Sequence, residues 1–112
     1  HEYGDVSPIN KNVAEPGMIF SIEPGIYIEG SHGVRLENEL LVCEGEKNEY
    51  GEFLYFEPIT YVPFDLDAIN PDIMNAEDKE RLNTYHATVY EKVSPYLNDE
   101  EKEWLKKYTR AI

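Results

Sequence analysis

Basic residues are scarce in this sequence. Lys and Arg together number 10 against 23 Asp and Glu, so the formal net charge at pH 7 is −13. A surface with this excess of negative charge repels phosphate backbones and anionic lipids. The composition therefore predicts a protein that binds neither nucleic acid nor an anionic membrane.

The sequence also has very little cysteine and no long apolar run. Cys43 is the one cysteine, which excludes an intrachain disulfide and is typical of a reducing compartment. No apolar run approaches the roughly 20 residues that a membrane-spanning helix needs. We therefore expect a soluble protein located in the cytoplasm.

What remains is the composition of a folded domain. Hydrophobic residues make up 41% of the chain and aromatic residues 12%, and 112 residues can bury a modest core of their own. The chain begins at His1, without a methionine, and leads directly into a loop rich in Gly, Pro and Asn. We expect this to be part of a longer protein.

The first half of the sequence has the pattern of antiparallel strands. Residues 1–17 are predicted to be loop, and Gly17 to close the turn before the first strand. A polar loop is predicted at 44–51. The expected strands, bounded by Pro and Gly turns, are 18–22, 26–28, 34–42 and 53–61.

The second half has the pattern of two helices. Asn75 is a good N-cap for a helix from Ala76 to about Ser94, and Pro95 ends it. Asn98 and Glu101 form a capping-box pattern before a second helix. We expect an α+β fold with antiparallel β-hairpins in residues 1–63 and a helical extension in 64–112. The predicted apolar faces, assigned to the core or an interface, are Leu82, Tyr85, Val89 and Val93, then Trp104, Leu105 and Tyr108.

Two glutamates interrupt the apolar patterns of the predicted strands. Glu23 ends an apolar strand beside the Pro24–Gly25 turn, and Glu37 alternates with Arg35 on the next long strand. Two buried carboxylates that converge repel each other, and a divalent Mn, Zn, Co or Fe ion removes the conflict. An acidic sheet also produces such pairs by chance, so the pair alone favours a structural role.

For three further residues a structural role or simple solvent exposure is the favoured interpretation. His32 is predicted to face solvent in a turn, and His86 to take part in a buried hydrogen bond beside Tyr85. Cys43 is interpreted as a small hydrophobic residue, because no histidine accompanies it as a base.

The sequence around the two glutamates is more specific. MIFSIEPGIYIEGSHGVRLENELLV resembles the last two metal-ligand motifs of the pita-bread metallopeptidases, the family of methionine aminopeptidase, prolidase and Xaa-Pro aminopeptidase. The resemblance implies a partial pita-bread fold, in which Glu23 binds one metal ion and takes part in proton transfer. It further implies that Glu37 bridges two metal ions and that Arg35 holds the acids in place.

The resemblance continues towards the C-terminus. FEPITYVPFDLDAI, LNTYH and EWLKKYTRAI resemble the tail of the three-domain Xaa-Pro aminopeptidase P subfamily. It implies a metal-dependent hydrolase that releases the residue preceding proline from peptides with proline at the second position. It also implies a homodimer and two divalent ions, usually Mn(II), although the ligand chemistry suits Zn or Co equally.

The family pattern is incomplete here. The family uses two Asp, one His and two Glu as ligands, and the first three are expected upstream of His1. His1-Glu2 matches a family segment whose His contacts substrate, but Tyr3-Gly4 stands where Gly-Pro is common. We therefore expect the isolated chain to be inactive and to bind no metal. The alternatives are a structural or dimerisation module and a pita-bread relative that binds without cleaving.

Overall fold

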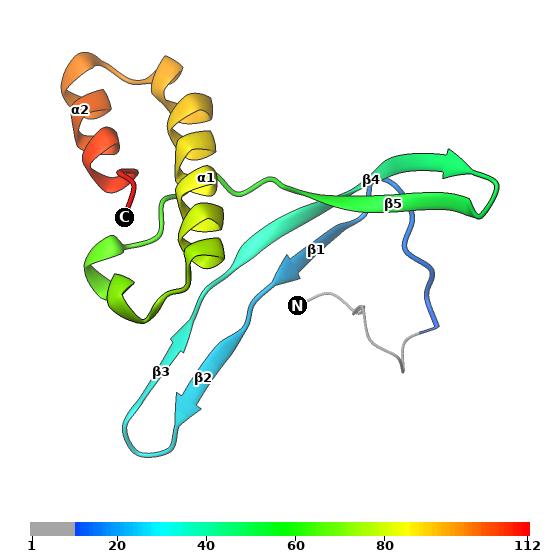
Figure 1. Ribbon diagram of the computed structural model, residues 1–112, viewed down its shortest axis with the longest axis horizontal. Coiled ribbons are helices and arrows are strands. Elements are labelled where there is room, and N and C mark those ends of the chain that lie inside the picture. Colours follow the sequence, from blue (N-terminus) through cyan, green and yellow to red (C-terminus); the bar gives the residue numbers. More distant parts are fainter. Residues whose placement is uncertain (1–10) are drawn as a thin grey trace. The chain divides into compact units, whose positions relative to one another are not determined.

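The computed structural model describes residues 11–112 (Figure 1), so the predicted substrate-contact residue His1 lies outside the described residues. The chain divides into two compact units, with the boundary between Thr60 and Tyr61. The first unit contains the strands and the second contains the helices.

Five strands form the first unit: β1 (Ile19–Ile22), β2 (Gly25–Ile28), β3 (His32–Arg35), β4 (Asn38–Asn48) and β5 (Gly51–Pro58). One antiparallel sheet has the order β1-β4-β5, and β2 and β3 form a second, two-stranded sheet (Figure 1). The turn before β1 ends at Gly17, whose φ of 90° favours glycine. The predicted antiparallel hairpins are confirmed.

The two sheets share one register. Ile22 pairs with Asn38 at the end of one ladder, and Gly25 pairs with Arg35 at the start of the other, which leaves two unpaired residues on each side. At this interruption the Leu36 N–H donates to the Pro24 carbonyl at 3.2 Å. The reciprocal bond is missing because proline has no N–H. The prediction of one continuous strand over 34–42 is therefore wrong: the strand breaks opposite Pro24.

The predicted polar loop at 44–51 is also wrong. β4 continues to Asn48, and β5 begins at Gly51 after a two-residue turn, with Gly51 at a φ of 141°. Lys47 pairs with Glu52 across the strands and forms an ion pair with it. A strand exposed on both faces needs no apolar alternation, so its polar sequence resembles that of a loop. The returning strand likewise ends at Pro58 rather than at residue 61.

The strand unit has little core. Among the described residues of this unit, Val42 is the one hydrophobic residue that is buried, with a relative exposure of 2%. A sheet buries its apolar faces only against a second layer, and none is described within this unit. The expectation of a modest core is thus not met here. The large exposed hydrophobic residues of the strands and their turns are Ile19, Ile22, Ile26, Tyr27, Ile28, Val34, Leu36, Tyr50, Phe53, Leu54, Tyr55 and Phe56.

The second unit contains α1 (Ala76–Val93), α2 (Asp99–Tyr108) and three short 3-10 turns, η1 (Leu66–Ala68), η2 (Pro71–Ile73) and η3 (Ser94–Tyr96). The Asn75 side chain accepts a hydrogen bond from the Asp78 N–H at 2.8 Å, and both bonds of the Asn98–Glu101 capping box are present. The predicted helix starts are therefore confirmed. Neither helix in the described part of the chain has both the length and the apolar character that crossing a membrane requires.

The core of the helical unit contains Leu66, Val89, Leu105 and His86, all buried. The Phe64 N–H donates to His86 Nε2 at 3.0 Å, which confirms the predicted buried hydrogen bond, and burial lowers the pKa of His86. Trp104 is 58% exposed and contacts the Tyr108 ring at a centroid distance of 4.6 Å. Of the predicted apolar face of α2, Leu105 is the residue that the unit buries.

Candidate functional site

Glu23 and Glu37 lie opposite each other at the interruption between the two ladders. Extending either register through the gap pairs Glu23 with Glu37 and Pro24 with Leu36. Directly opposed residues on antiparallel strands project to the same side, with Cβ atoms about 5 Å apart. The strand geometry therefore brings together the two acids that the sequence singles out.

Arg35 joins the two carboxylates. Its Nη1 lies 3.6 Å from Glu23 Oε2, and its Nη2 lies 3.0 Å from Glu37 Oε2. The other oxygen of Glu23, Oε1, accepts a hydrogen bond from Ser21 Oγ at 2.9 Å. A planar guanidinium has a donor for each acid, which a lysine would not offer in a fixed geometry. The two glutamates are thus held by one cation that the sequence places two residues before Glu37.

The one positive charge of Arg35 balances only part of the two negative charges of Glu23 and Glu37. Like charges directly opposite each other destabilise a ladder, and Arg35 offsets this repulsion. The pKa of Arg35 is raised, first by the Glu37 carboxylate and then by the Glu23 carboxylate, while partial desolvation opposes the shift. The Glu23 and Glu37 side chains are 31% and 40% exposed. The prediction that the pair is buried is therefore wrong, because no second layer within the unit covers this face.

Tyr27 lies on the same face, and the sequence analysis did not single it out. Its ring packs flat along the hairpin: a Cβ at Gly25 would lie 2.7 Å from the Tyr27 hydroxyl oxygen, and one at Gly33 2.6 Å from Cδ1. Gly33, which pairs with Tyr27, and Gly25, two residues before it on the same strand, leave the space that the ring occupies. Tyr27 also contributes to the raised pKa of Arg35. The signal available in the sequence was its spacing of four residues from Glu23, which places both on one face of the strand.

Glu39 lies on the same strand face as Glu37, two residues along the ladder, whereas Cys43 and His32 lie farther from the two glutamates. Glu39 faces Ser21 across the ladder, and its backbone N–H donates to Thr60 Oγ1 at 2.8 Å. Cys43 is half-buried opposite Tyr55. His32 is exposed at the far end of the β2–β3 hairpin, where its Nδ1 lies 2.8 Å from Ser31 Oγ.

The donor set fits part of a metal site. Carboxylate oxygens suit divalent Mn, Zn and Co, and Glu23 and Glu37 each direct one oxygen at the guanidinium of Arg35. A structural or catalytic metal takes four or more ligands. Residues 11–112 contain no group of three or more His, Cys, Asp or Glu side chains arranged to hold an ion. Glu23 and Glu37 would thus supply two ligands of a larger set.

Two family profiles match the sequence. The profile described as the C-terminal region of peptidase M24 matches residues 52–112, and that of metallopeptidase family M24 matches residues 1–44. The second match includes Glu23, Arg35 and Glu37.

Curated relatives and a solved structure agree with the profiles. The chain is 37% identical to human Xaa-Pro aminopeptidase 2 over its whole length and 38% identical to aminopeptidase P1 of Arabidopsis thaliana over 94% of its length. It also matches the crystal structure of the X-prolyl aminopeptidase of Caenorhabditis elegans, described as a cytosolic enzyme with a di-nuclear active site. There the TM-score is 0.74, with 28% identity over 88% of this chain. In each case the chain spans 17% of the length of the matched protein.

Proposed function

The chain belongs to metallopeptidase family M24, and from this membership we propose that it is the C-terminal part of an Xaa-Pro aminopeptidase. The observation that carries the proposal is the register that pairs Glu23 with Glu37 beside Arg35, on the stretch that matches the family profile. The proposed parent enzyme releases the N-terminal residue of peptides with proline at the second position.

Each residue of the cluster has a proposed role. Glu23 and Glu37 would hold two divalent metal ions, with Glu37 between them and Glu23 on one. Glu23 would in addition take up or return a proton at its carboxylate, where Ser21 Oγ already donates to Oε1. Arg35 would orient both acids, because its two Nη atoms contact one oxygen of each. Two divalent ions, when bound, supply the Lewis acidity that hydrolysis of the amide before proline requires.

The finer properties of the parent are proposals as well. We propose Mn(II) as the metal, with Zn or Co as chemically suitable substitutes, and a cytoplasmic homodimer that binds neither nucleic acid nor membranes. His1 is proposed to contact substrate. Residues 1–63 would belong to the catalytic domain and residues 64–112 to a helical extension. The chain by itself is proposed to lack activity, since Glu23 and Glu37 are two of five ligands.

Hydrolysis of an Xaa-Pro peptide by the Mn-loaded parent tests the roles of the glutamates. Glu23→Gln and Glu37→Gln remove one carboxylate charge each and should lower kcat/KM by at least about a hundredfold, since metal ligands and a proton acceptor are lost. Glu29→Gln, in the β2–β3 turn of the same hairpin, is the matched control and should leave activity unchanged. Full activity in both ligand variants contradicts the assignment.

A second candidate function is that of a structural module. The helical unit has capped helices and its own buried residues, Leu66, Val89 and Leu105, and it leaves Trp104 exposed. Such a unit suits packing against another protein surface. The activity of the Glu23→Gln and Glu37→Gln parents distinguishes the two candidates, because a chain that is only a structural module would leave hydrolysis unchanged in both variants. Xaa-Pro hydrolysis by the purified 112-residue chain would contradict the separate proposal that the chain alone lacks activity.

A further inference from the structure

The carboxylate of Glu23 has a different partner at each oxygen. Oε1 accepts a hydrogen bond from Ser21 Oγ at 2.9 Å, whereas Oε2 lies 3.6 Å from Arg35 Nη1. The first distance is within the range of hydrogen bonds and the second is beyond it. Of these two contacts, the one with Ser21 therefore does more to fix the orientation of the carboxylate.

Glu37 is held in another way. Arg35 Nη2 donates to Glu37 Oε2 at 3.0 Å, so the guanidinium forms a hydrogen bond with Glu37 but reaches Glu23 only as a nearby charge. A charge attracts a carboxylate without selecting which of its oxygens faces it. A hydroxyl donor does select, because one oxygen accepts its proton. The two acids thus depend on different residues for their orientation.

Strand geometry places the Ser21 hydroxyl beside Glu23. The two residues are separated by one position along the end of β1, so their side chains share a face. Ser21 also faces Glu39 across the ladder. A serine hydroxyl has one proton to donate, and in this structure that proton goes to Glu23. The one hydroxyl of β1 is therefore engaged by the acid that follows the strand.

We propose that Ser21 is the positioning residue of Glu23 in the metal site of the parent enzyme. Its hydroxyl holds Oε1, so the carboxylate offers its oxygens to a divalent ion in one orientation. Metal-binding carboxylates are themselves held by hydrogen bonds, and loss of the donor typically weakens metal binding about 10- to 100-fold. This inference rests on the proposed function and extends it to a residue outside the ligand set.

A structural role for the same hydrogen bond has different consequences. Ser21 is exposed and the Glu23 side chain is 31% exposed, so water competes for both groups and their bond adds little to the stability of the strand. Positioning, in contrast, acts on one ion. Glu23 is proposed to bind one of the two ions, whereas Glu37 is proposed to lie between them. Loss of the Ser21 hydroxyl should therefore weaken one ion and spare the other.

Isothermal titration calorimetry of the demetallated parent with Mn(II) tests this role without a measurement of activity. Ser21→Ala removes the hydroxyl and should bind one of the two ions at least about tenfold more weakly, with the affinity for the other unchanged. Ser21→Thr retains the hydroxyl on a residue that strands favour. It should bind both ions with the affinities of the unaltered parent.

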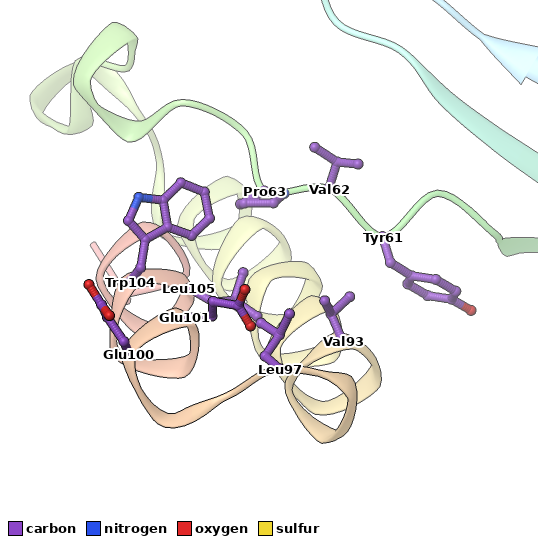
Figure 2. Close-up of a pocket in the computed structure, with 9 residues that line it drawn as sticks. All are labelled: Tyr61, Val62, Pro63, Val93, Leu97, Glu100, Glu101, Trp104 and Leu105. Atoms are coloured by element: carbon purple, nitrogen blue, oxygen red, sulfur yellow. The ribbon is translucent and has the colours of Figure 1, made fainter.

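Two control variants separate positioning from general effects. Ser31→Ala removes a serine hydroxyl from the turn between β2 and β3, where Oγ lies 2.8 Å from His32 Nδ1, and should leave both affinities unchanged. Leu105→Ala removes a buried side chain at the apolar groove of the helical unit (Figure 2). It should lower the unfolding temperature by creating a cavity and still bind both ions as the unaltered parent does.

Three results overturn the positioning role: unchanged affinity for both ions in Ser21→Ala, equal weakening of both ions in that variant, or a loss in Ser21→Thr as large as in Ser21→Ala. If the unaltered parent binds two ions, any of these results contradicts the role of Ser21 alone and leaves the proposed function standing. An unaltered parent that binds fewer than two Mn(II) ions contradicts both proposals.

Discussion

A single arginine organises the candidate site. Glu23 and Glu37 oppose each other where the ladder is interrupted, and Arg35 contacts one oxygen of each at 3.6 and 3.0 Å. Without a cation between them, two carboxylates at this spacing repel, so Arg35 stabilises an arrangement that strand pairing alone disfavours. The same arrangement presents both acids to one side, which is what a shared metal site requires.

His86 makes the helical unit sensitive to acid. A backbone N–H can only donate, so Nε2 must be the acceptor for Phe64 and the neutral ring carries its proton on Nδ1. Burial lowers the folded-state pKa below the unfolded value of about 6.5. The unfolded state therefore binds more protons between the two pKa values. Stability is fully present above about pH 6.5 and should fall as the pH drops below it, with a slope limited to one proton.

Urea unfolding at pH 7.5 and 5.5 measures this effect. In His86→Gln the side-chain carbonyl can still accept the Phe64 N–H but does not titrate in this range. We expect the loss of unfolding free energy between the two pH values to be smaller in His86→Gln than in the unaltered chain. An equal loss in both proteins contradicts a titrating His86.

At the level of elements, α2 depends on its first turn. Asn98 Oδ1 accepts from the Glu101 N–H at 3.0 Å, and the Glu101 carboxylate accepts from the Asn98 N–H. Asn98→Ala removes an acceptor and should lower the unfolding free energy by about 1 kcal/mol. Asn98→Asp retains an acceptor oxygen at the same position and should cost much less. Thermal unfolding of both variants checks the difference; equal losses would show that the cap bond does not stabilise the helix.

Elements with a local chemical signal were predicted from the sequence. The caps at Asn75 and Asn98 and the stop at Pro95 depend on side chains within a few residues, so the starts of both helices and the end of the first were placed within one or two residues. The bounds of the long strand were not predicted correctly. Its break at Leu36 depends on Pro24 across the ladder, and the extension of β4 to Asn48 depends on pairing with β5. Both are effects of a partner strand, which periodicity along one segment does not contain.

The same distinction applies within the site. Glu23 and Glu37 were found because each interrupts an apolar strand pattern within a recognisable motif. Tyr27 was missed because its position depends on Gly25 and Gly33, which meet its ring only once β2 and β3 are in register. The exposure of Glu23 and Glu37 was also missed, since burial requires a covering layer that the local pattern does not specify.

At the scale of the whole molecule, the strand unit exposes apolar residues along most of its length. Val42 is buried while Ile26, Tyr27 and Phe53 are each at least 50% exposed. Sheets of this composition normally pack against a second layer. The chain spans 17% of the length of its matched relatives, and the proposed parent would supply both this layer and the remaining ligands.

The metal content of the parent protein tests the proposed half-site at this scale. Inductively coupled plasma mass spectrometry after dialysis against Mn(II) counts bound ions per chain for the unaltered parent, Glu23→Gln, Glu37→Gln and the control Glu29→Gln. The predicted result is two ions in the unaltered parent and in the control, and fewer than two in both ligand variants, with the greater loss in Glu37→Gln because it is proposed to bridge the ions. Two ions retained in both ligand variants would contradict the assignment of Glu23 and Glu37 as metal ligands.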